Sequence, residues 1–190
     1  MLIQAIQSTQ NENTVYSASM SVRDLAKVTE IDFADPMTGK DGYQRKPNDR
    51  RFYEIANYLT YDNSMMPPAI VLSYRGKLNK KKIDGDIVRI DFDETEKLYV
   101  IDGQHRRAAM DILYDYVKTV VHTQRYPKKT NVFPTEKKGE ALTGSESFAW
   151  NSVWEQLAGE NTVVVEIHLG LDMDMERQLF HDLNNLSKKV

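Results

Sequence analysis

Residues 98–120 read LYVIDGQHRRAAMDILYDYVKTV, and the spacing of the apolar residues changes within this stretch. Residues 98–101 form a continuous apolar run, which is typical of a buried strand. After Asp102 and Gly103 the apolar side chains recur three and four residues apart, as in a helix packed on a sheet. These positions are Ala109, Ile112, Leu113, Tyr116, Val117 and Val120. The stretch therefore predicts a strand, a sharp turn and a long helix.

The flanking sequence continues this alternation of strands and helices. Runs rich in β-branched or apolar residues predict strands at 15–20, 69–74, around 87–90 and at 162–169. Capping residues and helical spacing predict helices from Ser21 to Val28, from Asn48 through Leu59, around 150–157 and from Asp172 or Asp174 onward. Proline and glycine predict a loop at 32–47 and a polar excursion at about 126–148. The order indicates an α+β (α/β) fold, with helices packed on a small mixed sheet in one domain, 1–190.

Two of these helices have an apolar stripe in the sequence. In the helix that follows Asn48 the stripe is Phe52, Ile55, Ala56 and Leu59. In the last helix the same spacing is found at Met175, Leu179, Leu183 and Leu186. Both patterns are typical of amphipathic helices.

Composition excludes several classes of protein. The chain has 190 residues, 41% of them hydrophobic and 28% charged, with a net charge of -3, which is typical of a folded globular domain. No apolar run approaches the roughly 18 residues needed to cross a bilayer, and the N-terminus does not resemble a secretory signal, so we expect a cytoplasmic protein with no membrane partner. The absence of cysteine excludes disulfides, thiolate nucleophiles and cysteine-ligated zinc.

The turn after residue 101 is the candidate functional site. Extending the helical stripe backwards from Ala109 places Arg106, His105 and Asp102 on the side that faces the core. Burying such groups without partners costs several kcal/mol, so we expect a negative ligand beside them. Arg106 and Arg107 in a first turn also oppose the helix dipole, by about 0.3 to 1 kcal/mol each, and a phosphate held by the free amides there would reverse that penalty.

Asp102 has more than one interpretation. It can cap the helix, orient His105 or hold a divalent metal bound to the phosphates. A simpler hypothesis makes Asp102 only a cap and pairs the arginines with local carboxylates such as Asp111 or Glu96. The spacing alone does not choose between these hypotheses.

Basic residues also cluster elsewhere. Arg45 to Arg51 include Arg50 and Arg51, which we regard as candidate DNA contacts. The tract at 77–82, KLNKKK, is predicted to lie in a hairpin or loop as a solvated surface rather than a phosphate contact.

Three segments resemble one protein family. Residues 102–106 read DGQHR, residues 42–59 read GYQRKPNDRRFYEIANYL, and residues 177–190 read RQLFHDLNNLSKKV. In this order they resemble DGQHR-domain proteins, whose best-known members are the DndB proteins of bacterial DNA phosphorothioation systems. DGQHR is also similar to the corresponding turn of the ParB and sulfiredoxin superfamily and to the DGQQR box of GmrSD-type restriction proteins.

The resemblance implies a ParB-like fold whose DGQHR turn handles nucleotide or nucleic-acid phosphate, with hydrolysis in some relatives. The implied site is Asp102, Gly103, Gln104, His105, Arg106 and the adjacent Arg107, assisted by Gln44 and Arg45. In the downstream box, Phe180 and Leu183 are expected in the core, whereas Asp182 and Asn184 are expected to reach the pocket. Gln104 stands where sulfiredoxins have their reactive cysteine, which excludes that activity. Related proteins are commonly longer, so a further C-terminal region after Val190 remains open.

The first functional hypothesis is a DndB-like accessory or regulatory protein of a DNA-modification and phage-defence system, associated with transcription regulation. It would bind nucleotide (ATP or CTP) or DNA phosphate, together with other proteins of that system. The alternative is an Mg²⁺-dependent nucleoside triphosphatase or a ParB-like nuclease, with Asp102 holding the metal and His105 as general acid or base. A third hypothesis is an interaction scaffold with a vestigial pocket. The sequence indicates no oligomeric state.

Overall fold

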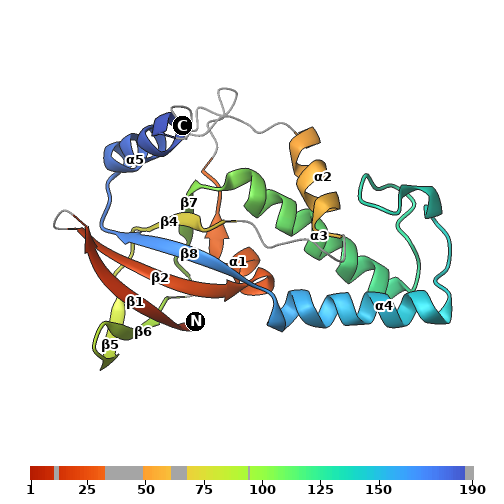
Figure 1. Cartoon of the computed structure of the whole chain (residues 1–190), viewed down its shortest axis with the longest axis horizontal. Helices are drawn as coiled ribbons and strands as arrows, with labels where there is room; N and C mark the ends of the chain where they lie inside the picture. The colour runs from red at the N-terminus through yellow and green to blue at the C-terminus, as the bar shows by residue number, and fades with distance from the viewer. Residues whose placement is uncertain (11–12, 33–48, 61–67, 94, 187–190) are drawn as a thin grey trace.

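A computed structural model describes residues 1–10, 13–32, 49–60, 68–93 and 95–186. Within them one mixed sheet has the strand order β3-β7-β4-β8-β2-β1-β6-β5. The strands are β1 (Leu2–Gln10), β2 (Asn13–Ser21), β3 (Thr29–Glu30), β4 (Ile70–Tyr74), β5 (Asn79–Asp84), β6 (Ile87–Asp91), β7 (Leu98–Asp102) and β8 (Thr162–Leu169). The sheet curls, and helices lie against it and beyond its edge (Figure 1). The expected α+β fold with a mixed sheet is confirmed.

The α-helices of the described residues are α1 (Val22–Val28), α2 (Asp49–Tyr58), α3 (Gln104–Thr123), α4 (Gly144–Glu155) and α5 (Met173–Leu186). A short 3₁₀ turn, η1, spans Thr135–Lys137, and a π-helical turn, η2, spans Gln156–Glu160. Ser21 caps α1 as predicted, since its side chain accepts a hydrogen bond from the Asp24 amide. Asp172 caps α5 in the same way, by accepting from the Met175 amide at 2.8 Å.

Two boundaries differ from the sequence prediction. The fourth helix begins at Gly144 rather than near Trp150, because Thr143 and Glu146 form a reciprocal capping box there. The strand β1 was not expected, because Ala5 is the buried residue among its nine, and the other side chains are largely exposed. Pairing with β2 on one side and β6 on the other holds it in the sheet. The predicted loop at 32–47 and the cap at Asn48 lie almost entirely outside the described residues.

The strands β6 and β7 follow each other in the chain but are not neighbours in the sheet. β6 pairs with β1 and β5, whereas β7 lies between β3 and β4. The lysine tract at 77–82 lies partly in β5, the edge strand of a hairpin with β6, and every side chain of β5 is exposed. Charged side chains are a common protection of an edge strand against pairing with other chains.

The core lies between the sheet and the buried face of α3. Its fully buried large side chains include Tyr16, Tyr74, Leu72, Ile101 and Ile167 from the strands. From α3 the predicted stripe is buried at Ala109, Leu113, Tyr116, Val117 and Val120, with Met110 in addition, whereas Ile112 is half-buried. No helix of the described residues is both long enough and apolar enough to cross a membrane.

The core positions expected for Phe180 and Leu183 on the last helix are wrong. Met175 is 43% exposed, and Phe180 and Leu183 are half-buried rather than core residues. The buried residue of the first turn is instead Glu176, which is fully inaccessible and paired with Arg75. The helix is therefore oriented by an ion pair, which apolar periodicity does not reveal.

Candidate functional site

The turn between β7 and α3 is as sharp as the sequence predicts. Gly103 has a φ of 91°, in the left-handed region, and separates Asp102 at the end of β7 from Gln104 at the start of α3. A Cβ atom at this position would lie 2.8 Å from Nη2 of Arg106 and 3.1 Å from a side-chain carbon of Ile70. Both the backbone angle and the close packing therefore require glycine here.

Asp102 is the partner of Arg106. The Arg106 guanidinium donates to the Asp102 carboxylate at 2.8 Å and to the Ala69 carbonyl at 3.2 Å, and its side chain is 22% exposed. No side chain of the described residues caps α3, so the interpretation of Asp102 as the helix cap is wrong. Arg106 lies against the protein as predicted, but a carboxylate of the chain itself already balances its charge.

Arg107 requires a correction. Its side chain is only 5% exposed and forms an ion pair with Asp111, one turn along α3. It also donates to the Thr29 hydroxyl and to the Ala26 carbonyl at 3.0 Å. The hypothesis of a local carboxylate partner is therefore right for Arg107, and this residue needs no ligand to balance its charge.

His105 brings the second helix into the site. Its ring lies 5.5 Å from the Phe52 ring, centroid to centroid, so α2 packs directly over the first turn of α3. Burial lowers the pKa of His105, the nearby charge of Arg51 lowers it further, and Asp102 partly offsets both effects. The structure thus brings the charge of Arg51, which was predicted only as a general DNA contact, close enough to act on His105. Arg51 and His105 each lie at the edge of the apolar stripe of their own helix. This position is the one signal in the sequence that the two residues could come close together.

The lowered pKa of His105 predicts a pH dependence of stability. Since the folded state resists protonation, the contribution of His105 is fully present above its ordinary pKa of 6.5 and is lost as pH falls through the lower folded-state value. We expect the melting temperature of the wild type to fall more than that of His105→Gln between about pH 7 and about pH 5. Differential scanning fluorimetry measures both profiles, with His122→Gln at the exposed end of α3 as the control. Parallel profiles for wild type and His105→Gln would contradict this assignment.

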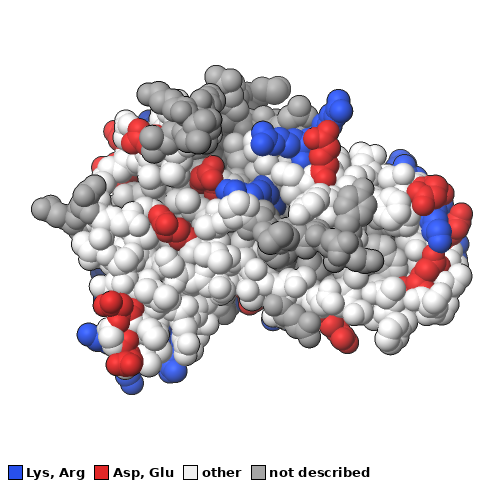
Figure 2. Space-filling view, in the orientation of Figure 1, with Lys and Arg blue, Asp and Glu red and all other residues white. Residues whose placement is uncertain are grey.

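The remaining predicted residues are distributed around this turn or away from it. Gln104 is half-buried, and its side-chain oxygen has no hydrogen-bond partner among the described residues. Arg50 forms an exposed pair with Glu54 at 2.9 Å. Gln44 and Arg45 lie outside the described residues. Figure 2 shows acidic and basic side chains gathered beside α2, whereas the face over β1, β2 and β8 is nearly free of charge.

The downstream box lies on α5. Asp182 accepts a hydrogen bond from Gln178 at 2.8 Å and lines a cavity of about 300 Å³ together with His168 and Val15. Asn184 donates to the Phe180 carbonyl at 2.8 Å. The hydrogen bond of Asp182 is therefore within its own helix. His168 itself is buried, and its ring nitrogen lies 2.8 Å from the Glu166 carboxylate.

The metal hypothesis names a single protein ligand, Asp102, and stays a prediction. The described residues contain no group of three or more His, Asp or Glu side chains placed to hold a metal ion. The Asp102 carboxylate, the predicted ligand, is bonded to Arg106. A magnesium ion at this turn would therefore compete with Arg106 and would take most of its oxygen ligands from water or phosphate.

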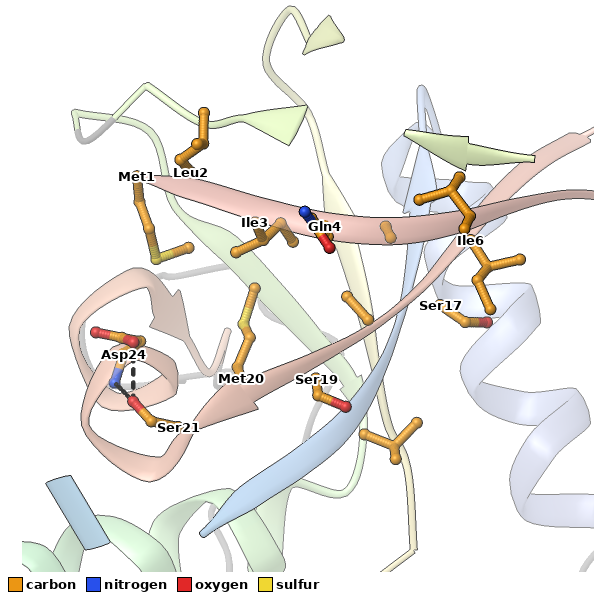
Figure 3. A pocket seen from close by; sticks show the side chains of 14 residues that line it. Met1, Leu2, Ile3, Gln4, Ile6, Ser17, Ser19, Met20, Ser21 and Asp24 are labelled. Atoms are coloured by element: carbon orange, nitrogen blue, oxygen red, sulfur yellow. Dashed lines mark hydrogen bonds between the residues drawn. The ribbon is translucent and has the colours of Figure 1, made fainter. Parts of the chain in front are cut away.

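A larger cavity lies away from this turn, on the curled face formed by β1 and β2 (Figure 3). It has a volume of about 690 Å³ and is lined by apolar side chains such as Leu2, Ile6 and Met20, with serines between them. Its carboxylate, Asp24, accepts a hydrogen bond from the Ser21 hydroxyl at 2.8 Å as part of the α1 cap. The lining is mostly apolar and has few ionisable side chains, so we do not place the function in this cavity.

The comparison with protein families agrees with the three resembling segments. A family model for DndB, described as DNA-sulfur modification-associated, matches residues 3–190. The chain belongs to the DndB family. No curated protein and no solved structure gives a significant match, so membership of the wider ParB superfamily stays a prediction. The family assignment connects this DndB-family protein to DNA sulfur modification, and the geometry of the turn is the basis for the role proposed next.

Proposed function

We propose that the DGQHR turn and Arg51 form a phosphate-binding corner through which this DndB-family protein contacts nucleotide or DNA as an accessory of a DNA sulfur-modification system. The observation that carries this proposal is that the charges of Arg51 and Arg106 both act on His105, at the uncapped start of α3 where α2 packs through Phe52. Two cations from separate helices meet there at a helix end that favours anions.

The helix supplies backbone donors. α3 has 20 residues, and the amides of its first turn have no intrahelical acceptors. Gly103 lets the Arg106 guanidinium lie directly against this turn, because no Cβ atom stands in the way. A phosphate would therefore meet oriented dipoles as well as positive charge.

Arg106 would exchange partners rather than move far. Its ion pair with Asp102 joins residues four positions apart, and the Asp102 side chain is 39% exposed. Such pairs contribute at most about 1 kcal/mol, so a phosphate can compete for the guanidinium. Arg51 is exposed and has no hydrogen-bond partner among the described residues. Arg107 is excluded from the proposed corner because its side chain is buried among protein partners.

This proposal predicts selective losses of binding. Arg51→Ala and Arg106→Gln should each weaken binding of a short oligonucleotide about tenfold or more, because a charge-assisted hydrogen bond is worth about 1.5 to 3 kcal/mol. Each should also reduce the salt dependence by about one released counterion. Fluorescence anisotropy at several salt concentrations measures both quantities.

Arg50→Ala is the matched control, because Arg50 is the neighbour of Arg51 but is paired with Glu54. It should change affinity less than Arg51→Ala does. Equal losses of oligonucleotide affinity in Arg50→Ala and Arg51→Ala would show that binding depends on a general basic surface and not on the proposed corner. Unchanged binding in both Arg51→Ala and Arg106→Gln would overturn the proposal. If nucleotide does not raise the melting temperature of the wild type, that result would favour the scaffold hypothesis.

The second candidate is Mg²⁺-dependent hydrolysis at the same corner. The observation in its favour is the lowered pKa of His105, which keeps the imidazole neutral and able to accept a proton. Phosphate release from ATP or CTP with Mg²⁺ and its loss in His105→Gln would support this function. Binding without turnover supports the accessory role alone.

A further inference from the structure

A third cavity, of about 620 Å³, lies between α3, α4 and the segment that connects them. Its volume falls within the range of about 300 to 1,000 Å³ typical of small-molecule sites. Aliphatic side chains from the end of α2, from α3 and from the α4 end form an apolar lining: Leu59, Leu113, Val153 and Leu157. The cavity is separate in its lining residues from the DGQHR turn.

Aromatic rings add flat surfaces to this lining. Trp150 is half-buried, and its indole N–H donates to the Tyr126 hydroxyl at 3.3 Å, which fixes both rings. The two ring centroids are 6.4 Å apart and nearly perpendicular. Phe133 also lines the cavity and is 48% exposed, an apolar surface that a bound ring would cover. Base-to-aromatic stacking contributes about 1 to 3 kcal/mol per base.

The polar groups of the lining are rich in acceptors. Glu146 accepts from the Tyr126 hydroxyl at 3.0 Å and pairs with Lys137, so the charge of the one lysine among the described lining residues is already balanced. Glu136 adds a second carboxylate, and Gln156 and Asn161 add amides. This charge disfavours a phosphate inside the cavity. It favours an uncharged ring that carries N–H donors on its edge.

The cavity is held open by α2. Both ends of the Asn57 amide group bind the segment before the Phe133–Pro134 wall: its oxygen accepts from the Phe133 amide at 2.7 Å, and its nitrogen donates to the Asn131 carbonyl at 3.2 Å. A wall fixed in this way costs little further ordering when a ligand binds.

The same two helices run from the proposed phosphate corner to this cavity. Leu59, directly after the end of α2, follows Arg51 by eight residues, and on α3 Leu113 follows His105 by eight residues. At a rise of 1.5 Å per residue, each interval is about 12 Å along the helix axis. The cavity therefore lies about two helical turns from the corner, measured along the axis of each helix.

We propose that the cavity between α3 and α4 binds a nucleobase, whose attached phosphate is held at the corner formed by Arg51 and the DGQHR turn. Binding of the base is inferred from the cavity alone, whereas binding of its phosphate at the corner rests on the function proposed above. The base stacks on Trp150 and Phe133 and donates from its edge to the carboxylate and amide oxygens.

The test uses nucleosides, which contain the base and no phosphate. Trp154→Phe leaves Trp150 as the sole tryptophan of the chain, so its indole N–H resonance reports on the cavity. At least one of the four common nucleosides should shift this resonance. Ala149→Phe, at an exposed position that lines the cavity, should weaken that binding about tenfold or more by filling the space. Ser152→Phe is the matched control, because Ser152 is exposed on the same helix but does not line the cavity. This variant should change the nucleoside affinity by less than about twofold.

Tripolyphosphate separates this inference from the proposed function. It should bind wild type and Ala149→Phe equally and lose affinity in Arg51→Ala. Nucleoside binding without tripolyphosphate binding would retain the base site and reject the corner, and the reverse result would reject the base site. No nucleoside shift in a folded protein, or binding that survives Ala149→Phe, overturns the inference. Comparing a mononucleotide with a single-stranded oligonucleotide then shows which source of base is bound more tightly.

Discussion

Arg75→Ala is expected to lower the free energy of unfolding by about 3 to 5 kcal/mol, the cost of leaving a buried charge without its partner. Glu176 is fully buried, and Arg75 meets it with two hydrogen bonds, of 2.9 and 2.5 Å. The pair ties α5 to the end of β4, and the hydrogen bond to Glu176 raises the pKa of the arginine further. Urea unfolding followed by circular dichroism measures the loss.

The converse variant makes this prediction sharper. Glu176→Gln should cost less than Arg75→Ala, because Arg75 is 30% exposed, lies 3.8 Å from the centre of the Tyr99 ring and has Asp32 at 3.5 Å. Arg177→Gln is the control: it breaks an exposed pair with Asp174 on the same helix and should change stability by less than about 1 kcal/mol. A loss no larger for Arg75→Ala than for Arg177→Gln would show that the pair does not orient α5.

Arg107→Ala is expected to destabilise the protein by about 3 kcal/mol, which is a structural effect rather than a selective loss of ligand binding. Arg107 joins α3 to α1 and β3 through Ala26 and Thr29, and it pairs with Asp111. Its removal leaves a hydroxyl, a carbonyl and a carboxylate without their donor. Thermal and urea unfolding of Arg107→Ala and Arg106→Gln, measured side by side, test whether neighbouring arginines have these different roles.

The pH dependence of Arg107→Ala provides a second check. Burial raises the pKa of Asp111 in the folded protein, and Arg107 opposes this effect. A raised folded-state pKa means that stability is fully present below the unfolded-state value and is lost as pH rises through the folded-state value. The deficit of Arg107→Ala should therefore shrink as pH falls toward about 4. It should also shrink at neutral pH when Asp111→Asn is added. A folded Arg107→Ala protein of normal stability that no longer binds phosphate would contradict this view.

Membership of the DndB family and the geometry of the turn give complementary information. The family model covers residues 3–190 and connects the chain to DNA sulfur modification. The packing of α2 over α3 then identifies which side chains meet at the turn. Experiments on this DndB-family protein can therefore start from Arg51, His105 and Arg106 rather than from every basic residue.

The sequence by itself determined the elements whose signals are local. The change of apolar spacing after residue 101 predicted β7, the Gly103 turn and α3, because strand and helix periods are read directly from neighbouring residues. The β-branched run of β8 and the caps at Ser21 and Asp172 were equally local. The three resembling segments also determined the family.

Only the tertiary structure decided how charges are paired and which segments meet. Arg106 and Arg107 are adjacent and chemically identical in the sequence, yet successive helical residues point about 100° apart, so one faces Asp102 at the turn and the other enters the core beside Thr29. The burial of Glu176 depends on Arg75, 101 positions away, and β1 is held by strands on both sides rather than by its own pattern. Such partners come together only through folding, because the free energy of a buried charge depends on what lies opposite it in space and not on its neighbours along the chain.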